Sequence, residues 1–445
     1  MTAPSLSRLM GHLVADTAHA AIPDQVRLRA RVSLLHNLTV GLAGRSRDPV
    51  AHRMVRRFWA HPAEATLLHD GTPASIEGAA IANAALFHAR SQDDTHAAST
   101  SHPGSPTMAA ALAIGEAGGH GGAEVLDAIV LGYEVLGRIG RAFDEGITAR
   151  GFRAAAVLGG FGAAAVAARL LRLSAEQTAH ALGFAANLAG GLAQVWREGS
   201  AEGPLQLGFA ARNGISAARA AAAGATAACA ALDGPAGFFH AYADTDDAPA
   251  EALRGIGHTW QLTEVTVKPY PVCAILQGPV GCMLALDVTG APEEVALTLN
   301  PYEAAYPGID HPGPFASAIA TKMSAQFSLA LALVTGRVNA EGLARIDDPA
   351  VLAMARRVRV VADPAIAPRQ CRLMLRMDDG RTLSGSVEAR VGQPSFDEAA
   401  NFARALAPEM GASAGAVDRL VAAVAELEHA PNLGALFSAA LGCGR

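Results

Sequence analysis

Lysine is nearly absent from this chain. Among 35 basic residues in 445, only Lys268 and Lys322 are lysines. A desolvated ammonium group can release its proton near neutral pH, whereas a guanidinium group keeps its charge. A lysine that survives in an arginine-rich chain is therefore a candidate base, and we single out Lys268; chance survival of both lysines is the alternative.

Cysteine, aromatic residues and excess charge are also scarce, and each shortage argues against a class of protein. The five cysteines are an odd number, widely spaced and without a Cys-x-x-Cys pair. We therefore expect no disulfide framework, no metal site and a cytoplasmic location. The net charge of −6 comes without a basic block, which argues against nucleic acid as a partner.

No segment has the pattern of a signal peptide or of a membrane span. The first ten residues lack an apolar core. The alanine-rich run at 154–171 is closely bracketed by Arg153, Arg169 and Arg172, and alanine and glycine give it little hydrophobicity. We predict a buried helix there and no membrane partner.

The patterning predicts a mainly α fold with an α+β part. Apolar residues recur with helical spacing up to about residue 262, strands follow, and helical spacing returns after Pro394. We predict a large all-helical domain (1–263 and 397–445) and a smaller α+β domain (264–396). The expected helices include 107–118, 123–143, 154–171, 175–195, 206–224, 316–335, 396–406, 414–427 and 432–441.

A β-hairpin is the clearest feature of the α+β part. Alternate residues from Cys371 to Met377 are apolar, and Asp378-Asp379-Gly380 then turns the chain. The alternation continues on the return strand through Val387, Ala389 and Val391. Further strands are predicted at 294–299 and 357–362.

The segment 93–104 concentrates ionisable groups between two predicted helices. It contains Asp93, Asp94, Thr95, His96 and His102. Histidine exchanges protons near neutral pH, and a neighbouring carboxylate can fix its tautomer and raise its basicity. A helix-capping segment with surface histidines is the alternative, but the density of ionisable groups favours a site.

Two other segments carry candidate site residues. Lys268-Pro269-Tyr270-Pro271 follows the predicted domain boundary, and its prolines would hold the Lys268 and Tyr270 side chains in fixed directions. Arg153 stands at a helix start, and Arg197 follows an apolar helix, so both could bind carboxylates. A rigid connector and solvated arginines are the alternatives.

Taken together, these segments resemble the MmgE/PrpD family, which includes 2-methylcitrate dehydratases, cis-aconitate decarboxylases and an iminodisuccinate epimerase. The resemblance covers nearly the whole chain. The matching elements, in order, are His88…Asp93-Asp94-Thr95-His96…His102-Pro103-Gly104, Gly132-Tyr133-Glu134-Val135, Gly151-Phe152…Gly159…Phe161-Gly162-Ala163-Ala164, Gly208…Ala211-Arg212-Asn213-Gly214, Lys268-x-Tyr270-Pro271-x-Cys273 and Gln326-Phe327-Ser328. The resemblance implies an active site between the two domains, commonly a homodimer, and cofactor-free chemistry on small di- or tricarboxylates.

Several positions depart from the family pattern. Arg153 stands where members commonly carry histidine, and Ser91 where an aspartate is often found. The Lys-Pro-x-His element of the family reads Gly203-Pro204-Leu205-Gln206, and Gln277 replaces a further histidine. These replacements remove proton carriers, which indicates an altered substrate specificity or a relocated acid.

The resemblance and the residues together predict a lyase that abstracts a proton α to a carboxylate, in the manner of 2-methylcitrate dehydratase. We expect His102 or Lys268 as the base, Tyr270 as its acid partner, and Asp93 or Asp94 as the residue that orients His102. The expected substrate-binding residues are Asp94, Thr95, Arg153, Arg197, Gln206 and Gln277. An epimerase of a substituted dicarboxylate, or a non-catalytic polycarboxylate-binding or structural dimer, is the alternative.

Overall fold

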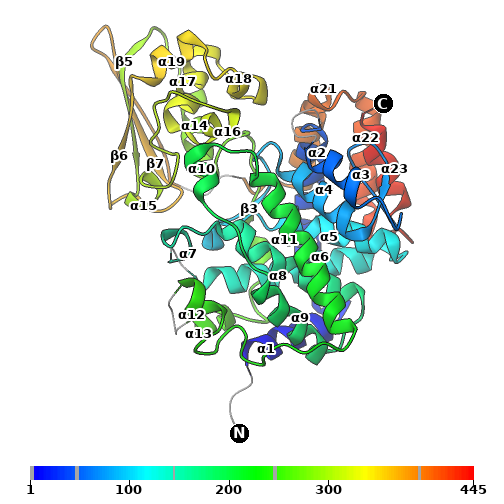
Figure 1. Cartoon of the computed structure of the whole chain (residues 1–445). Helices are drawn as coiled ribbons and strands as arrows, with labels where there is room; N and C mark the ends of the chain where they lie inside the picture. Colours follow the sequence, from blue (N-terminus) through cyan, green and yellow to red (C-terminus); the bar gives the residue numbers. More distant parts are fainter. Residues whose placement is uncertain (1–4, 46–49, 144–145, 244–247, 389–391, 445) are drawn as a thin grey trace.

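The computed structural model describes residues 5–45, 50–143, 146–243, 248–388 and 392–444, and they form a mainly helical protein with one four-stranded sheet and two two-stranded ladders (Figure 1). Outside the sheet-bearing unit the helices are α1 (Leu6–Asp16), α2 (Asp24–Leu42), α3 (Val50–Phe58), α4 (Ile76–His88), α5 (Gly104–Ala117), α6 (Gly122–Arg141), α7 (Gly146–Ala149), α8 (Ala154–Leu170), α9 (Ala175–Asn187), α10 (Gln194–Glu198), α11 (Gly203–Ala222), α12 (Phe238–Ala243), α13 (Ala248–Leu253), α20 (Phe396–Ala405), α21 (Ala407–Met410), α22 (Ala414–Ala425) and α23 (Gly434–Gly442).

Helix α8 is the centre of the helical unit. Every residue of α8 except Arg169 is buried, and α5, α6, α9 and α11 pack around it. Small residues make this packing possible: a Cβ on Gly162 would lie 2.5 Å from Thr107 Oγ1, and one on Gly132 would lie 2.9 Å from the Gly162 carbonyl oxygen. The prediction of a buried helix at this run is confirmed. Nowhere in the described ranges is a helix both long and apolar enough for a membrane span.

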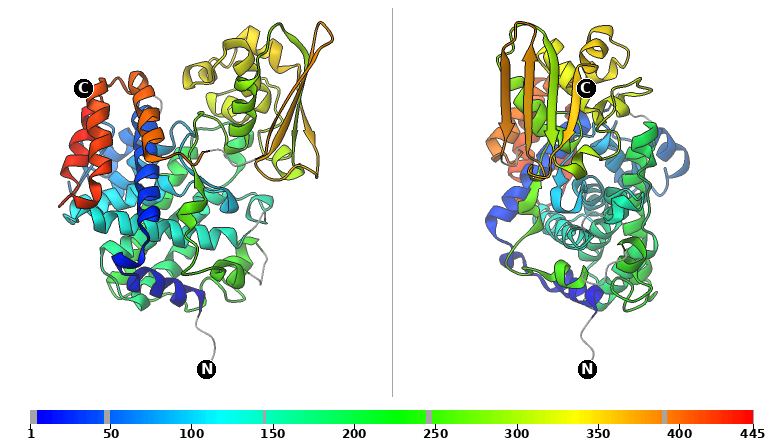
Figure 2. Two further views of the ribbon diagram at one scale, coloured as in Figure 1. Left: turned by 180° about the vertical axis from the view of Figure 1, so that it is seen from behind. Right: turned by 90° about the vertical axis from the view of Figure 1, so that its left-hand side faces the viewer.

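The C-terminal helices return to the helical unit. Helices α20 and α22 pack against α2, so the two ends of the chain share one hydrophobic core (Figure 2). A second core lies within residues 272–377. This division supports domain boundaries near 264 and 396, which we propose on that basis.

The smaller unit is a four-stranded sheet covered on one face by helices (Figures 1 and 2). The strands are β5 (Pro292–Leu299), β6 (Val358–Ala362), β7 (Cys371–Met377) and β8 (Thr382–Val387), in the order β6-β5-β7-β8. Only β5 and β6 run parallel. The helices are α14 (Gln277–Ala285), α15 (Pro301–Ala304), α16 (Ala318–Met323), α17 (Ala325–Thr335), α18 (Ala340–Ala344) and α19 (Pro349–Ala355).

The predicted hairpin is confirmed. Cys371, Leu373, Leu375 and Met377 are buried, and their neighbours on β7 are exposed. Ala389 and Val391, expected on the return strand, lie outside the described residues.

Two predicted helices are each broken in the structure. The helix expected at 175–195 ends at Asn187, because the following segment contains Gly191 at a φ of 134° before α10 begins. The helix expected at 316–335 is divided at Ser324, whose side chain accepts a hydrogen bond from the Phe327 N–H and so caps α17.

A buried arginine holds the segment that leads from the helical unit to the sheet unit. Arg138 on α6 forms an ion pair with Glu134 at 2.5 Å and is fully buried. Its guanidinium also donates to four carbonyl oxygens between residues 252 and 259, at 2.8 to 3.2 Å. Glu134 accepts a hydrogen bond from the backbone N–H of Gln261 at 2.7 Å. These bonds hold residues 252–261 in place, just before the Lys268 segment of the candidate site.

Arg138→Met should therefore destabilise the protein strongly, because it leaves the Glu134 carboxylate buried without its partner. We expect a loss of about 3–5 kcal/mol in the free energy of unfolding, measured by urea denaturation. The control is Arg404→Met, which removes an exposed pair with Asp418 and should cost under about 1 kcal/mol. Equal losses in the two variants would contradict this account.

Candidate functional site

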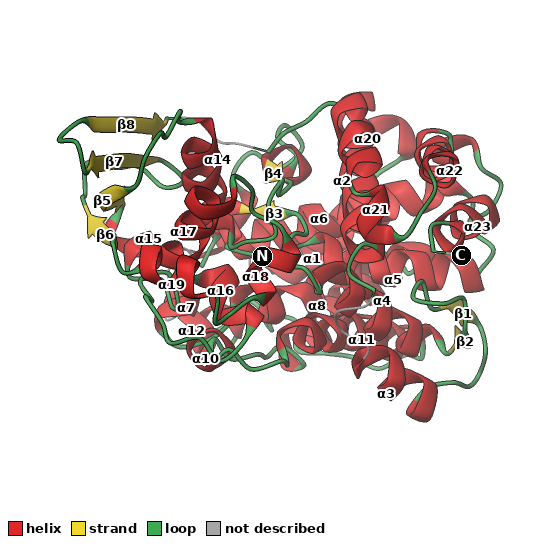
Figure 3. Cartoon of the chain, turned by 90° about the horizontal axis from the view of Figure 1, so that it is seen from above, coloured by secondary structure: helices red, strands yellow, loops and turns green. Residues whose placement is uncertain are grey.

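A two-residue ladder brings the predicted site segments together. Strand β3 (Thr95–His96) pairs antiparallel with β4 (Val265–Thr266), with Thr95 opposite Thr266. Both strands lie between the helical unit and the sheet unit (Figure 3). The Gln92 side chain adds a bond to the Pro269 carbonyl oxygen at 2.9 Å. The loop after α4 and the Lys268 segment therefore lie side by side.

The loop that carries the cluster is held in an uncommon backbone conformation. Ser91 and Thr100 have φ values of 55° and 46°, in the left-handed region that non-glycine residues rarely adopt. The loop ends at Gly104, where a Cβ would lie 2.5 to 2.6 Å from polar atoms of Asn37, Asp94 and Tyr133. Only glycine lets helix α5 begin this close to the cluster.

Asp93 is the centre of the cluster and is fully buried. One carboxylate oxygen, Oδ2, accepts hydrogen bonds from His88 Nδ1 at 2.8 Å and from Ser105 Oγ at 2.6 Å. The other, Oδ1, lies 3.6 Å from both His102 Nδ1 and Lys268 Nζ. Burial alone would raise the pKa of Asp93, but the neighbouring His88, His102 and Lys268 hold it well below its usual value.

His88 is held neutral between Asp93 and Arg153. The Arg153 guanidinium donates to His88 Nε2 at 2.7 Å, so the ring proton must lie on Nδ1, facing Asp93. Burial lowers the pKa of His88 to about 4. His88 can therefore orient Asp93, but it cannot take up a proton at Nε2 while Arg153 occupies that atom.

His102 presents an unprotonated ring nitrogen to a cavity. Its Nδ1 lies 2.9 Å from the Asp94 carbonyl oxygen, which can only accept, so Nδ1 carries the proton and Nε2 has the free lone pair. The side chain is 16% exposed and lines the cavity. Burial, with the Lys268 charge as a second cause, lowers the pKa of His102 well below its usual value. His102 is thus a neutral base at physiological pH.

Lys268 lies beside His102 with almost no exposure to solvent. Its Nζ donates to the Ser91 carbonyl oxygen at 2.8 Å and lies 3.4 Å from His102 Nδ1. Burial lowers the pKa of Lys268, and Asp93 opposes that shift. The other lysine, Lys322, is also buried and donates to the Ala89 carbonyl oxygen at 3.2 Å, so both lysines support the same loop.

Asp94 faces away from the cavity. Its carboxyl group contacts the Tyr133 hydroxyl and accepts the Gly104 N–H at 3.0 Å. Burial raises the pKa of Asp94 to about 7. The prediction that Asp94 binds substrate is therefore unsupported by its geometry, and its contacts indicate a role in holding helix α5 to the loop.

The cavity is lined by both units and has no carboxylate in its wall among the described residues. The predicted residues that line it are Thr95, His102 and Lys268. The remaining lining side chains are those of His88, Ser91, Thr100, Trp196, Cys273, Ala274, Ile275, Tyr306, Met323 and Arg369. Sequence reasoning missed Tyr306 and Arg369 as site residues, because each stands in a segment far from the others and without a motif of its own.

Several predicted site residues do not line this cavity. Tyr270 packs beside Gly281 on α14, whereas Tyr306 lines the cavity. Gln277 lines a smaller adjoining cavity, but its amide is bonded to the Tyr270 N–H at 3.1 Å and to the Tyr270 carbonyl oxygen at 2.9 Å. Arg197 is exposed on α10.

Arg153 and Gln206 lie together behind His88. The Arg153 guanidinium donates to Gln206 Oε1 at 2.9 Å and to the Gly203 carbonyl oxygen at 2.6 Å, and it stacks on Trp196 at 4.6 Å. Burial lowers the pKa of Arg153 to about 10, which still leaves it charged. With its donors directed to these groups and to His88, Arg153 does not clamp a ligand in the cavity.

The chemistry of the cluster does not fit a metal ion. His88, Asp93 and His102 each place a potential ligand atom within 4.8 Å of the others. However, both Nδ1 atoms that face Asp93 carry protons, and Lys268 and Arg153 add two positive charges beside the same three residues. A divalent cation binds to a ring nitrogen through its lone pair, whereas the two Nδ1 atoms here carry hydrogens.

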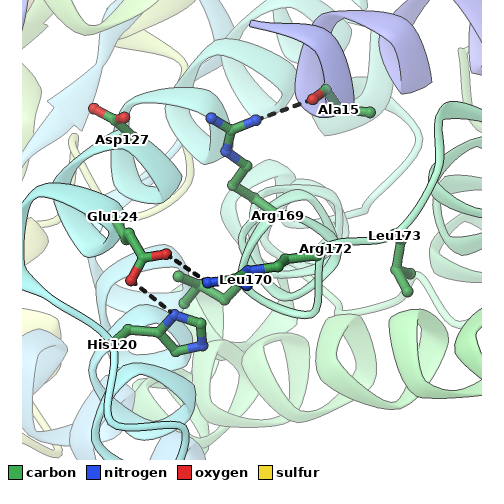
Figure 4. Close-up of a pocket in the computed structure, with 8 residues that line it drawn as sticks. All are labelled: Ala15, His120, Glu124, Asp127, Arg169, Leu170, Arg172 and Leu173. Carbon is green, nitrogen blue, oxygen red and sulfur yellow. Dashed lines mark hydrogen bonds and ion pairs between the residues drawn. The ribbon is translucent and has the colours of Figure 1, made fainter. Parts of the chain in front are cut away.

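The charged side chains of a larger cavity elsewhere are paired with other groups of the protein. It measures about 300 Å³, against about 50 Å³ for the His102 cavity, and lies between α1, α6 and α8 (Figure 4). Arg169 there donates to the Ala15 carbonyl oxygen at 3.0 Å, and Glu124 pairs with Arg172 at 3.0 Å and His120 at 3.3 Å. Because these charges are already paired, we place the candidate site at His102.

Asp94→Asn tests the raised pKa of that carboxyl group. Between about pH 4 and pH 7 the carboxyl group of Asp94 is protonated in the folded protein and ionised in the unfolded chain. The contribution of Asp94 to the free energy of unfolding therefore falls as the pH rises through this range. The free energy of unfolding of the variant minus that of the wild type should therefore increase over this range. Urea denaturation at pH 5 and pH 8, with circular dichroism to verify the native fold, measures it; a constant difference would contradict the assignment.

Comparisons with known proteins agree with this architecture. Residues 8–251 match the model of the MmgE/PrpD N-terminal domain, and residues 270–419 match that of the MmgE/PrpD C-terminal domain. The chain is 30% identical over 271 residues to a cis-aconitate decarboxylase-like protein of Aspergillus oryzae, covering 57% of this chain and 56% of that protein. It is 27% identical over 283 residues to the cis-aconitate decarboxylase of Aspergillus terreus, covering 60% and 57%. The chain thus spans little more than half the length of these relatives, and it belongs to the MmgE/PrpD family.

Proposed function

We propose that this protein is a cofactor-free lyase that abstracts a proton α to a carboxylate of a small di- or tricarboxylate. One observation carries the proposal: a neutral His102, with its Nε2 lone pair free, lies beside the buried Lys268 in a cavity whose described walls contain no carboxylate. A base next to a fixed cation suits the removal of a proton from an anionic substrate.

His102 is the proposed base. When Nε2 takes the substrate proton, the ring becomes cationic, and Asp93 lies 3.6 Å from its Nδ1 to stabilise that charge. Asp93 is in turn oriented by His88 and Ser105. The Asp94 carbonyl oxygen thus fixes the tautomer of His102, and Asp93 is the third group that supports the base through its charge.

Lys268 is the proposed partner that stabilises the developing enediolate. Its Nζ donates to the Ser91 carbonyl oxygen and lies 3.6 Å from the Asp93 carboxylate, whose negative charge favours the ammonium form. Because the ammonium group of Lys268 is already held in place, it does not have to reorient when negative charge forms on the substrate carboxylate. Tyr306, which also lines the cavity, is the proposed proton donor in place of Tyr270.

The fate of the carbanion defines the reaction, and we propose loss of a β-hydroxyl group, which leaves as water after it is protonated. Decarboxylation is the second candidate, because the relatives in Aspergillus oryzae and Aspergillus terreus bear the names of cis-aconitate decarboxylases. In that reaction no α-proton is removed: carbon dioxide leaves with cleavage of the C–C bond, and the electron pair left on carbon is then protonated. Return of the proton to the opposite face would instead give an epimerase. From the family resemblance we also propose a homodimer.

The direct test is proton exchange in heavy water. The enzyme is incubated with 2-methylcitrate, citrate, cis-aconitate and substituted succinates, and deuterium at the α-carbon is followed by NMR together with alkene, carbon dioxide and epimer formation. We expect exchange with at least one acid, and a loss of at least about 100-fold in its rate in His102→Gln and Lys268→Met. His120→Gln, which changes a histidine in the larger cavity, is the matched control and should leave the rate unchanged.

Each outcome bears on a different part of the proposal. Exchange that survives both substitutions would contradict the assigned base and cation. Saturable binding of an acid without exchange across the panel would replace the lyase with a carboxylate-binding protein. Product identity then separates loss of water from loss of carbon dioxide and from epimerisation.

A further inference from the structure

Arg369 brings a second fixed cation into the cavity from the sheet unit. It belongs to the loop between β6 and β7, far in sequence from the His102 loop. It lines both the His102 cavity and the smaller adjoining cavity, and Lys268 and Thr95 are shared by the same two cavities. Arg369 and Lys268 therefore line one continuous region of the site from two segments that are about 100 residues apart in the sequence.

The backbone of Arg369 is fixed by a buried carboxylate. Glu303 on α15 is 3% exposed, and its two oxygens each accept the Arg369 N–H at 3.2 Å. Arg369 has a φ of 66°, a left-handed conformation that these bonds maintain in a residue other than glycine. A strained residue that is held in place by a dedicated partner indicates that its side-chain position matters.

The Arg369 side chain is only partly used within the protein. Its Nε lies 3.4 Å from Glu303 Oε1, whereas its Nη1 is buried and has no hydrogen-bond partner. An unpaired buried N–H group is costly, and guanidinium is shaped to bind a carboxylate through two parallel hydrogen bonds. The free end of this guanidinium thus fits an anionic group of a ligand.

The charges around the cavity agree with a role for Arg369 in binding an anionic group. Burial raises the pKa of the Cys273 thiol, while the charges of Arg369 and Lys268 both lower it, so the two cations act on the same part of the cavity. His88 and His102 add no charge, because their pKa values are lowered by burial. Two cations that line the same cavity suit a ligand with two carboxylates.

We propose that Arg369 binds the distal carboxylate of the substrate and so selects di- and tricarboxylates over monocarboxylates. This inference rests on the proposed function for the identity of the site. Lys268 faces the carboxylate next to the reacting carbon, and Arg369 faces the remote one.

The test compares the binding of matched acids and does not require turnover. Tricarballylate (propane-1,2,3-tricarboxylate) and succinate are titrated against butyrate by calorimetry, using the full-length wild type, Arg369→Gln, Arg369→Lys and the control Arg372→Gln. Arg372 lies three positions further on, on β7, with its side chain 63% exposed. Circular dichroism and melting temperature verify that each variant is folded.

We expect the wild type to bind tricarballylate and succinate more tightly than butyrate. Arg369→Gln should weaken binding of both polyacids by at least about tenfold, as expected for a lost charge-assisted bond, and leave butyrate binding unchanged. Arg369→Lys should recover part of the affinity, because it keeps the charge but not the two parallel donors. Arg372→Gln should bind like the wild type.

Three results would overturn the proposal: no saturable binding of either polyacid to the wild type, unchanged polyacid binding in Arg369→Gln, or an equal loss for butyrate and the polyacids. Should Arg369→Gln fail to fold, Arg369→Lys decides, since full wild-type affinity in that variant would remove the need for bidentate recognition. A failure of proton exchange leaves this binding test intact, so the two proposals can fail separately.

Discussion

The site depends on one buried carboxylate, Asp93, whose charge is maintained by the groups around it. An isolated carboxylate at this depth would take up a proton, because burial penalises the charged form. His88, Ser105, His102 and Lys268 together reverse that tendency. The same contacts bring α4, the loop at 91–102, α5 and the Lys268 segment together around Asp93. The packing of these segments and the proposed chemistry therefore both depend on the charge of Asp93.

Three of the positions at which the chain departs from its family pattern are in contact with one another. Arg153 contacts both the Gly203 carbonyl oxygen and the Gln206 side chain, and these are the two positions where the Lys-Pro-x-His element is lost. Arg153 also fixes the tautomer of His88. The substitutions therefore exchange a set of titrating groups for a rigid support behind the cluster, and the proposed mechanism assigns proton abstraction to His102.

The sequence was a good guide to local structure and a weaker one to contacts between distant segments. Helical spacing and the 371–387 alternation predict α8 and the β7–β8 hairpin because those patterns depend on neighbouring residues. The density of ionisable groups found Asp93 and His102, and the rarity of lysine found Lys268. The contributions of Tyr306 and Arg369 depend on how the sheet unit docks, which no local pattern encodes, and Tyr270 was preferred only because it stands near Lys268 in the chain.

The protonation state of the two site histidines tests the central claim most directly. Long-range ¹H–¹⁵N NMR of protein labelled at histidine, with His88→Gln and His102→Gln for assignment, distinguishes neutral tautomers from imidazolium. At pH 7 we predict that both rings are neutral with the proton on Nδ1, and that His102 Nε2 carries none. An imidazolium signal for His102, or a proton on its Nε2, would contradict the account of a free base beside Lys268.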